Sequence, residues 1–316
     1  MVCFGVVLQN RASSYIGKIM LLEKRIPASY IFNKIKKDLV IIIFIGICAH
    51  FLSSAFIENI PEMPGNIPAF LGTAITVLLS FKISQSYDRW WEARKVWGAI
   101  VNDSRSFVIQ LQSFLQDASN PVIKLMGYRQ IAWCYSLGRT LRGLNPLEGL
   151  DEYLKEKDLL YITDHKNKPL AIAQLNALTI KNLYQTNEID TFKHIQLDST
   201  LVRMVDSMGK AERINGTVFP KTYRLFLHFA IYLFVITLSI SLREIPLIFE
   251  LPLLIVLSSV FLLLEKTAYH LQDPFRNRPS DTSVTAIART IEINIKQLLN
   301  EPDIPEPVQP NGFYIL

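Results

Sequence analysis

Four long apolar runs interrupt an otherwise mixed sequence, and their lengths give the first prediction. The first, about residues 39–57, contains no Asp, Glu, Lys or Arg and is long enough to cross a membrane as a helix. Three more follow, over about residues 67–83, 225–242 and 247–264. Charge-free runs of roughly 19 residues are uncommon in soluble cores. The chain is therefore expected to be an integral membrane protein with four spans.

Basic residues are distributed unevenly around these runs. Seven Lys or Arg residues precede the first run, from Arg11 to Lys37, whereas the loop after it, residues 58–66, has none. The positive-inside rule then predicts a cytoplasmic N-terminus, a cytoplasmic C-terminus and a plasma (inner) membrane location. The net charge of +5 is mostly accounted for by cytoplasmic segments that face anionic lipid, so lipid is an expected partner and nucleic acid is not.

The remaining chain reads as helices. From residue 84 to 116, apolar residues recur at helical spacing without an internal proline. A C-terminal helix and extended tail are predicted over residues 280–316, with Ser280 or Thr282 as the N-cap. Because no strand pattern or repeat is present, the fold class is all-α, a single domain over residues 1–316 with a cytoplasmic helical portion over residues 84–220. Three further helices are predicted within that portion, over about residues 121–141, 169–184 and 190–214.

The second run carries two neighbouring stripes when it is drawn as a helix. Thr73, Val77 and Phe81 recur at i+4 and form a largely apolar stripe. Small residues form the other stripe, and such stripes let membrane helices approach closely. The apolar stripe is then expected either to line a constriction between several copies or to pack inside the bundle of one subunit. The small-residue stripe consists of Gly72, Thr76, Ser80 and Ser84.

A charged, aromatic block follows this run directly: SYDRWWEARKVWG at residues 86–98, then NDSR at residues 102–105. Together with GTAITVLLSF before it, this block resembles the bestrophin family, especially its bacterial members. The segment KAERINGTVFPKTYRLFLHFAIYLF, then HLQDPF, then AIARTIE continue the resemblance in the same order. It covers most of the chain, from about Met20 to Glu301.

The resemblance implies a homopentameric ion channel, with chloride or other small anions as the permeant ions. It places the neck of the pore at Thr73, Val77 and Phe81, and a cytoplasmic aperture at Phe219, just before Pro220. Thr73 departs from the family's hydrophobic neck, and a ring of hydroxyls there is expected to wet the neck more readily. A monovalent-cation channel of the same fold remains an alternative because the neck carries no charged ring. A transporter or an anchored scaffold is a further alternative.

Other chemistry is expected to be absent. Animal bestrophins bind calcium through a run of acids, whereas this chain offers Asp273 and Asp281 beside two arginines, so calcium independence is predicted. The cysteines and histidines lack ligand spacing, so no metal, cofactor or enzymatic activity is expected. His50 and His228 lie within spans and are candidates for function, although a histidine hydrogen-bonded between helices is the commoner case.

Overall fold

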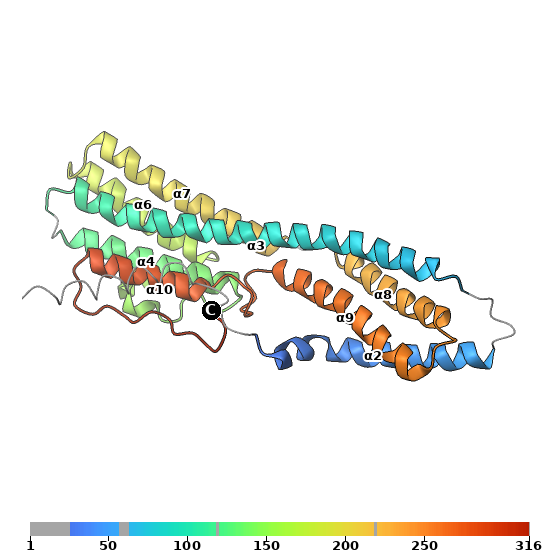
Figure 1. Ribbon diagram of the computed structural model, residues 1–316. Coiled ribbons are helices and arrows are strands. Elements are labelled where there is room, and N and C mark those ends of the chain that lie inside the picture. Colours follow the sequence, from blue (N-terminus) through green and yellow to red (C-terminus); the bar gives the residue numbers. More distant parts are fainter. Residues whose placement is uncertain (1–25, 57–62, 118–119, 218–219, 316) are drawn as a thin grey trace, which may run out of the picture. The chain divides into compact units, whose positions relative to one another are not determined.

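The computed structural model describes residues 26–56, 63–117, 120–217 and 220–315 (Figure 1). In these residues the regular structure is helical, apart from an isolated bridge between Asn311 and Tyr314, which confirms the all-α class. The chain divides into two compact units. We call the described residues within Arg25–Arg89 and Val218–Gln272 the span unit, and those within Trp90–Thr217 and Asp273–Leu316 the head unit. A single domain over residues 1–316 stays a prediction.

The span unit holds the four helices of the described chain that are long and apolar enough to cross a membrane. Each covers most of one predicted run. Their shared core consists of aliphatic side chains such as Ile42, Leu79 and Ile231, which are buried between the helices. The four helices are α2 (Ala28–Ala55), the first part of α3 (Asn66–Phe114), α8 (Lys221–Ser241) and α9 (Leu247–Leu271).

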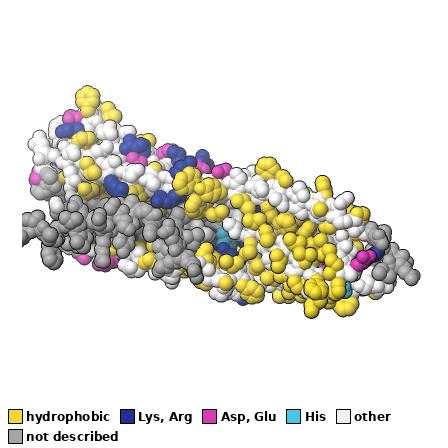
Figure 2. All heavy atoms as spheres, in the orientation of Figure 1, with side chains coloured by type: hydrophobic (Ala, Val, Ile, Leu, Met, Phe, Trp, Pro, Cys, Tyr) yellow, Lys and Arg dark blue, Asp and Glu magenta, His cyan; other side chains and the backbone are white. Residues whose placement is uncertain are grey.

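Large apolar side chains also cover the outside of the span unit. Phe44, Phe70 and Phe249 are among the most exposed, and Figure 2 shows hydrophobic side chains spread over the visible face of this unit. Such a surface is unfavourable in water but suits hydrocarbon, where helices satisfy their own backbone groups. The span unit is therefore a membrane bundle.

The head unit packs helices around a core rich in aromatic and aliphatic residues. Trp97 and Phe107 from the second part of α3 meet Trp133 from α4 in this core, and all three are fully buried. Charged side chains lie on its outer surface, as Figure 2 shows. Besides α3, its helices are α4 (Pro121–Leu141), α5 (Glu156–Thr163), α6 (Lys168–Gln185), α7 (Thr191–Gly216) and α10 (Val284–Leu298), with a short 3-10 helix at Leu150–Glu152.

Side-chain caps explain why three of these helices begin where they do. Asn120 accepts a hydrogen bond from the backbone N–H of Val122, and Pro121 fills the first helical position, where no N–H is needed. Asn167 and Asp190 cap α6 and α7 in the same way. These starts lie within two residues of the predicted ones.

The C-terminal helix begins later than predicted. Its N-cap position is Ser283 rather than Ser280 or Thr282, and the Ser283 side chain does not cap the helix. Instead, its hydroxyl donates to the carbonyl oxygen of Ile315 at 2.7 Å, so the end of the tail lies beside the start of α10. The predicted caps were wrong because the helix begins only at Val284, so both Ser280 and Thr282 lie before its N-cap position.

Candidate functional site

The apolar stripe of α3 lies on the outside of the span unit. Val77 is 50% exposed and Phe81 is 63% exposed in the single chain, and Thr73 is also exposed. The interpretation in which these residues pack inside the bundle of one subunit therefore does not fit the structure. What they face in an assembly is left as a prediction.

The opposite side of the same helix is buried. Ile75 and Leu79 pack into the span-unit core, and Lys82 and Ser86 continue that side toward the end of the unit. The spacing of three to four residues keeps these four side chains on one face. The direction of the exposed stripe is thus fixed by what the rest of the helix buries.

The residues of the small-residue stripe have two different environments in the single chain: one packs against α8 and three are exposed. A Cβ atom added to Gly72 would lie 3.4 Å from the Phe234 ring, so Gly72 allows α3 and α8 to approach within one chain. Thr76, Ser80 and Ser84 are exposed instead. A role for these three residues in packing between copies stays a prediction.

The threonine hydroxyls of both stripes are satisfied within the helix. Thr73 donates to the carbonyl oxygen of Ala69 at 2.9 Å, and Thr76 donates to that of Gly72 at 2.8 Å. Each hydroxyl oxygen keeps acceptor capacity on the exposed side. Thr73 can therefore still hydrogen-bond water beside an otherwise apolar stripe.

A cavity of about 640 Å³ lies next to Phe81, the last residue of the apolar stripe. Phe81, Lys82 and Gln85 line it from α3, and Pro220 and Tyr223 line it from the start of α8. The predicted aperture residue, Phe219, immediately precedes Pro220 but lies outside the described residues. Its role is therefore untested.

Lys82 stands at the end of the second apolar run, where a lysine can reach toward lipid headgroups, but its side chain is buried here. It is 1% exposed, and its Nζ atom lies 2.9 Å from Glu265 Oε1. Glu265 is fully buried and also faces Arg224 Nε at 3.4 Å and His228 Nε2 at 3.3 Å. The ammonium group stays inside the bundle because α9 offers it a buried carboxylate as a partner.

A second buried carboxylate connects three spans. Glu250 Oε2 on α9 lies 2.6 Å from His50 Nδ1 on α2, and Ser239 on α8 donates to the other carboxylate oxygen. Glu250 is fully buried. This is the structural role that a lone membrane histidine most often has, and it accounts for His50 without a metal.

Two residues of the charged, aromatic block hydrogen-bond to the backbone of the segment that follows α9. Within the span unit, Arg89 Nε donates to the carbonyl oxygen of Gln272 at 3.0 Å, just after α9 ends. Within the head unit, Trp90 Nε1 donates to the carbonyl oxygen of Ser280 at 2.9 Å. Both residues therefore hold the segment that follows the fourth span, which supports a structural role for Arg89.

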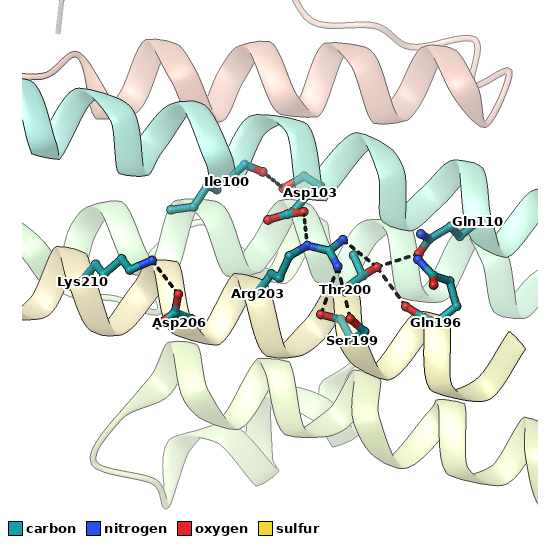
Figure 3. A network of polar contacts seen from close by, with 10 residues as sticks. Ile100, Asp103, Gln110, Gln196, Ser199, Thr200, Arg203, Asp206 and Lys210 are labelled. Atoms are coloured by element: carbon teal, nitrogen blue, oxygen red, sulfur yellow. Dashed lines mark hydrogen bonds and ion pairs between the residues drawn. The ribbon is translucent and has the colours of Figure 1, made fainter. Parts of the chain in front are cut away.

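Further along α3, acidic side chains pair with basic side chains of α7. Arg203 Nε donates to Asp103 Oδ1 at 2.9 Å, and its Nη2 atom donates to Thr200, as Figure 3 shows. Arg213 makes an equivalent pair with Glu92 at 2.8 Å. These pairs are partly exposed, so water screens them and each contributes little to stability.

The segment after α9 holds a buried acid rather than a calcium clasp. Asp281 is 1% exposed and accepts a hydrogen bond from the backbone N–H of Arg278 at 3.0 Å. Burial raises the pKa of this carboxyl group to about 6, although the arginines beside it act in the opposite direction. Among the described residues, no cluster of three or more His, Cys, Asp or Glu side chains could hold a metal ion. Calcium independence remains a prediction.

The sequence contains a signal that buried ion pairs are present, but it does not show which residues pair. Lys82, Glu250 and Glu265 are ionisable residues at or inside apolar helices, and such residues need partners when they are buried. Which side chains meet depends on the packing of helices far apart in the chain.

Comparisons with known proteins agree with this architecture. The family described as "Bacterial/Fungal Bestrophin protein" matches residues 18–297. The voltage-dependent anion channel-forming protein YneE of Escherichia coli strain K12 is 31% identical over 249 residues, covering 78% of this chain and 81% of that protein. The corresponding protein RSc3414 of Ralstonia nicotianae is 24% identical over 252 residues, covering 78% and 81%. A crystal structure of a bacterial bestrophin homolog from Klebsiella pneumoniae superposes with a TM-score of 0.79 at 26% identity, covering 85% of this chain and all of that one.

Proposed function

The chain belongs to the bacterial and fungal bestrophin family, and we propose that it is an anion channel whose pore is lined by α3. One observation carries the proposal. The stripe of Thr73, Val77 and Phe81 is exposed and uncharged, while the ionisable side chains Lys82 and Glu265 of the same unit are turned inward and paired. A surface of this kind suits a narrow apolar constriction.

A constriction needs several copies around an axis. The family resemblance implies a homopentamer, and the exposed apolar side chains of the span unit offer surface for contacts with other copies as well as with lipid. In this assembly five copies of Thr73, Val77 and Phe81 form the neck. Phe219, which directly precedes Pro220 in the sequence, forms the second constriction.

The same proposal sets the topology and the partners. The basic residues before the first span favour a cytoplasmic N-terminus and C-terminus in the plasma (inner) membrane. The head unit then lies in the cytoplasm. The permeant ions are chloride and other small anions, membrane lipid surrounds the spans, and nucleic acid, cofactors and calcium have no part. The protein is not an enzyme.

Ion flux tests the proposal directly. Purified protein, first confirmed as an oligomer, is reconstituted into liposomes, and current is recorded across a salt gradient. A current above that of empty vesicles, with a reversal potential near that of chloride, is expected. A reversal potential near that of the cation would instead assign the cation alternative, and no current from intact oligomers would remove the channel proposal.

The aperture is tested in the same recordings. Phe219→Ala is expected to raise conductance or change ion preference because it widens the second constriction. Phe249→Ala is the control, since Phe249 is an exposed phenylalanine of the span unit far along the chain from both predicted constrictions. An unchanged current in Phe219→Ala would remove this residue from the pore.

A further inference from the structure

The neck stripe cannot by itself choose between anions and cations. Thr73, Val77 and Phe81 carry no charge, and selectivity in a pore depends on the charges and dipoles close to the permeant ion. A charge close behind the stripe can therefore favour one sign of ion. The described part of the span unit has a charged group at such a place.

That group is the ammonium of Lys82, the residue directly after Phe81. Lys82 is buried, and it lines the same cavity as Phe81 and Gln85. Its Nζ atom donates to Glu265 Oε1 on α9 at 2.9 Å. A positive charge thus lies beside the inner end of the neck without being exposed in it.

The cluster around Lys82 is not electrically balanced. Among the described residues, Glu265 is the acid paired with Lys82, while both Lys82 and Arg224 bring a basic side chain to this carboxylate. His228 also faces Glu265. The neighbouring pair, Lys266 with Asp38 at 2.9 Å, is neutral. The cluster therefore contains more basic than acidic side chains.

Buried charge acts over a longer distance than exposed charge. Away from water the effective dielectric constant is lower and mobile ions do not screen the field. In an assembly of several copies the buried ammonium group of Lys82 repeats around the axis, beside the cavity that Phe81 also lines. An ion that has lost part of its hydration in an apolar neck would then sense a positive potential.

We propose that Lys82 is a specificity-determining residue of the pore, supplying from behind the neck the positive potential that favours anions. The inference rests on the proposed channel function. The alternative is a purely structural role, in which the pair of Lys82 and Glu265 only holds α3 against α9. The two roles differ in what happens when each partner of the pair is neutralised separately.

The experiment compares permeability ratios of chloride to sodium for variants reconstituted in liposomes at one fixed pH. Lys82→Met is expected to lower this ratio by about threefold or more, since one charge is lost near the neck in every copy. Glu265→Gln breaks the same pair but is expected to raise the ratio. Lys82→Arg keeps the charge and should restore the wild-type ratio. Lys266→Met, which removes the same charge from a pair that does not line the cavity of Phe81, should change the ratio clearly less than Lys82→Met.

The outcomes separate the inference from the function it rests on. No current from wild-type oligomers would overturn the channel proposal itself. Wild-type anion preference that persists in Lys82→Met, or that shifts in the same direction in Lys82→Met and Glu265→Gln, would overturn the role of Lys82 alone. If a single variant does not assemble, the exchange K82E with E265K keeps a pair and moves the negative charge beside Phe81. That double variant should lose anion preference, and an unchanged ratio would again reject the inference.

Discussion

The two halves of α3 place their charges on opposite sides. In the span unit the outer stripe of the helix is uncharged, and Lys82 is turned inward toward Glu265. In the head unit the charges lie outside, where Glu92 and Asp103 pair with basic residues of α7. One helix thus meets two solvents. Charge is turned inward where the outside is lipid or a narrow pore, and outward where the outside is water.

The largest predicted effect on stability comes from the buried, apolar side of α3 in the head unit. Trp97 is fully buried, and a Cβ atom added to Gly138 would lie 3.7 Å from its ring. Trp97→Ala would remove a large side chain from a core that cannot collapse around the gap, costing about 3–5 kcal/mol of unfolding free energy. Loss of thermal stability in detergent, followed by size-exclusion fluorescence, measures it.

Trp91 provides the matched control for this prediction. It lies on the same helix, six residues earlier, but is 46% exposed in the single chain. Trp91→Ala is therefore expected to cost clearly less than Trp97→Ala. Equal losses would mean that the two faces of this half do not differ as the structure describes.

The two units also differ in how they accommodate a buried acid. Glu265 has three basic side chains around it. Asp281 of the head unit accepts a backbone hydrogen bond and lies near arginines, but burial still raises its pKa to about 6. Asp281→Asn removes the cost of a buried charge. It is expected to stabilise the protein by about 1–3 kcal/mol near pH 7.

The sign of this effect follows from proton binding. The pKa of Asp281 rises on folding from its ordinary value of 3.8 to about 6, so the folded state binds the proton more tightly. Stability from this group is complete at low pH and falls as pH rises through about 6. The benefit of Asp281→Asn should therefore vanish near pH 4. Asp273→Asn, at a less buried acid of the same segment, is the control, and a destabilised Asp281→Asn protein would contradict the argument.

Local patterns were enough to predict most of the helices. The apolar runs identified the four spans, and the prolines and caps around Pro121 and Asp190 gave the starts of α4, α6 and α7 to within two residues. The short helix α5 was not predicted, because eight residues carry too little periodicity to stand out. The spacing of apolar residues is a local property of the sequence, so it predicts a helix without knowledge of contacts between distant segments.

Contacts between distant segments were beyond the sequence. The i+4 spacing defined the stripe of Thr73, Val77 and Phe81, but only the packing of the other spans determines that it is exposed. The position of Lys82 at the end of a run fits either an exposed or a buried head group. Its partner, Glu265, is 183 residues away, so no local pattern could choose between the two.

The smallest predicted effect concerns the outer stripe itself. Thr73→Val keeps the shape of the side chain but removes the one hydroxyl of the stripe, so the neck becomes fully apolar and loses water more easily. Conductance is expected to fall about two- to threefold, measured as single-channel current. Thr76→Val is a close control, because Thr76 makes the same hydrogen bond to the backbone four residues earlier and belongs to the other stripe. If both variants reduce the current equally, the effect comes from the helix backbone. If Thr73→Val leaves the current unchanged, then water in the neck does not depend on this hydroxyl.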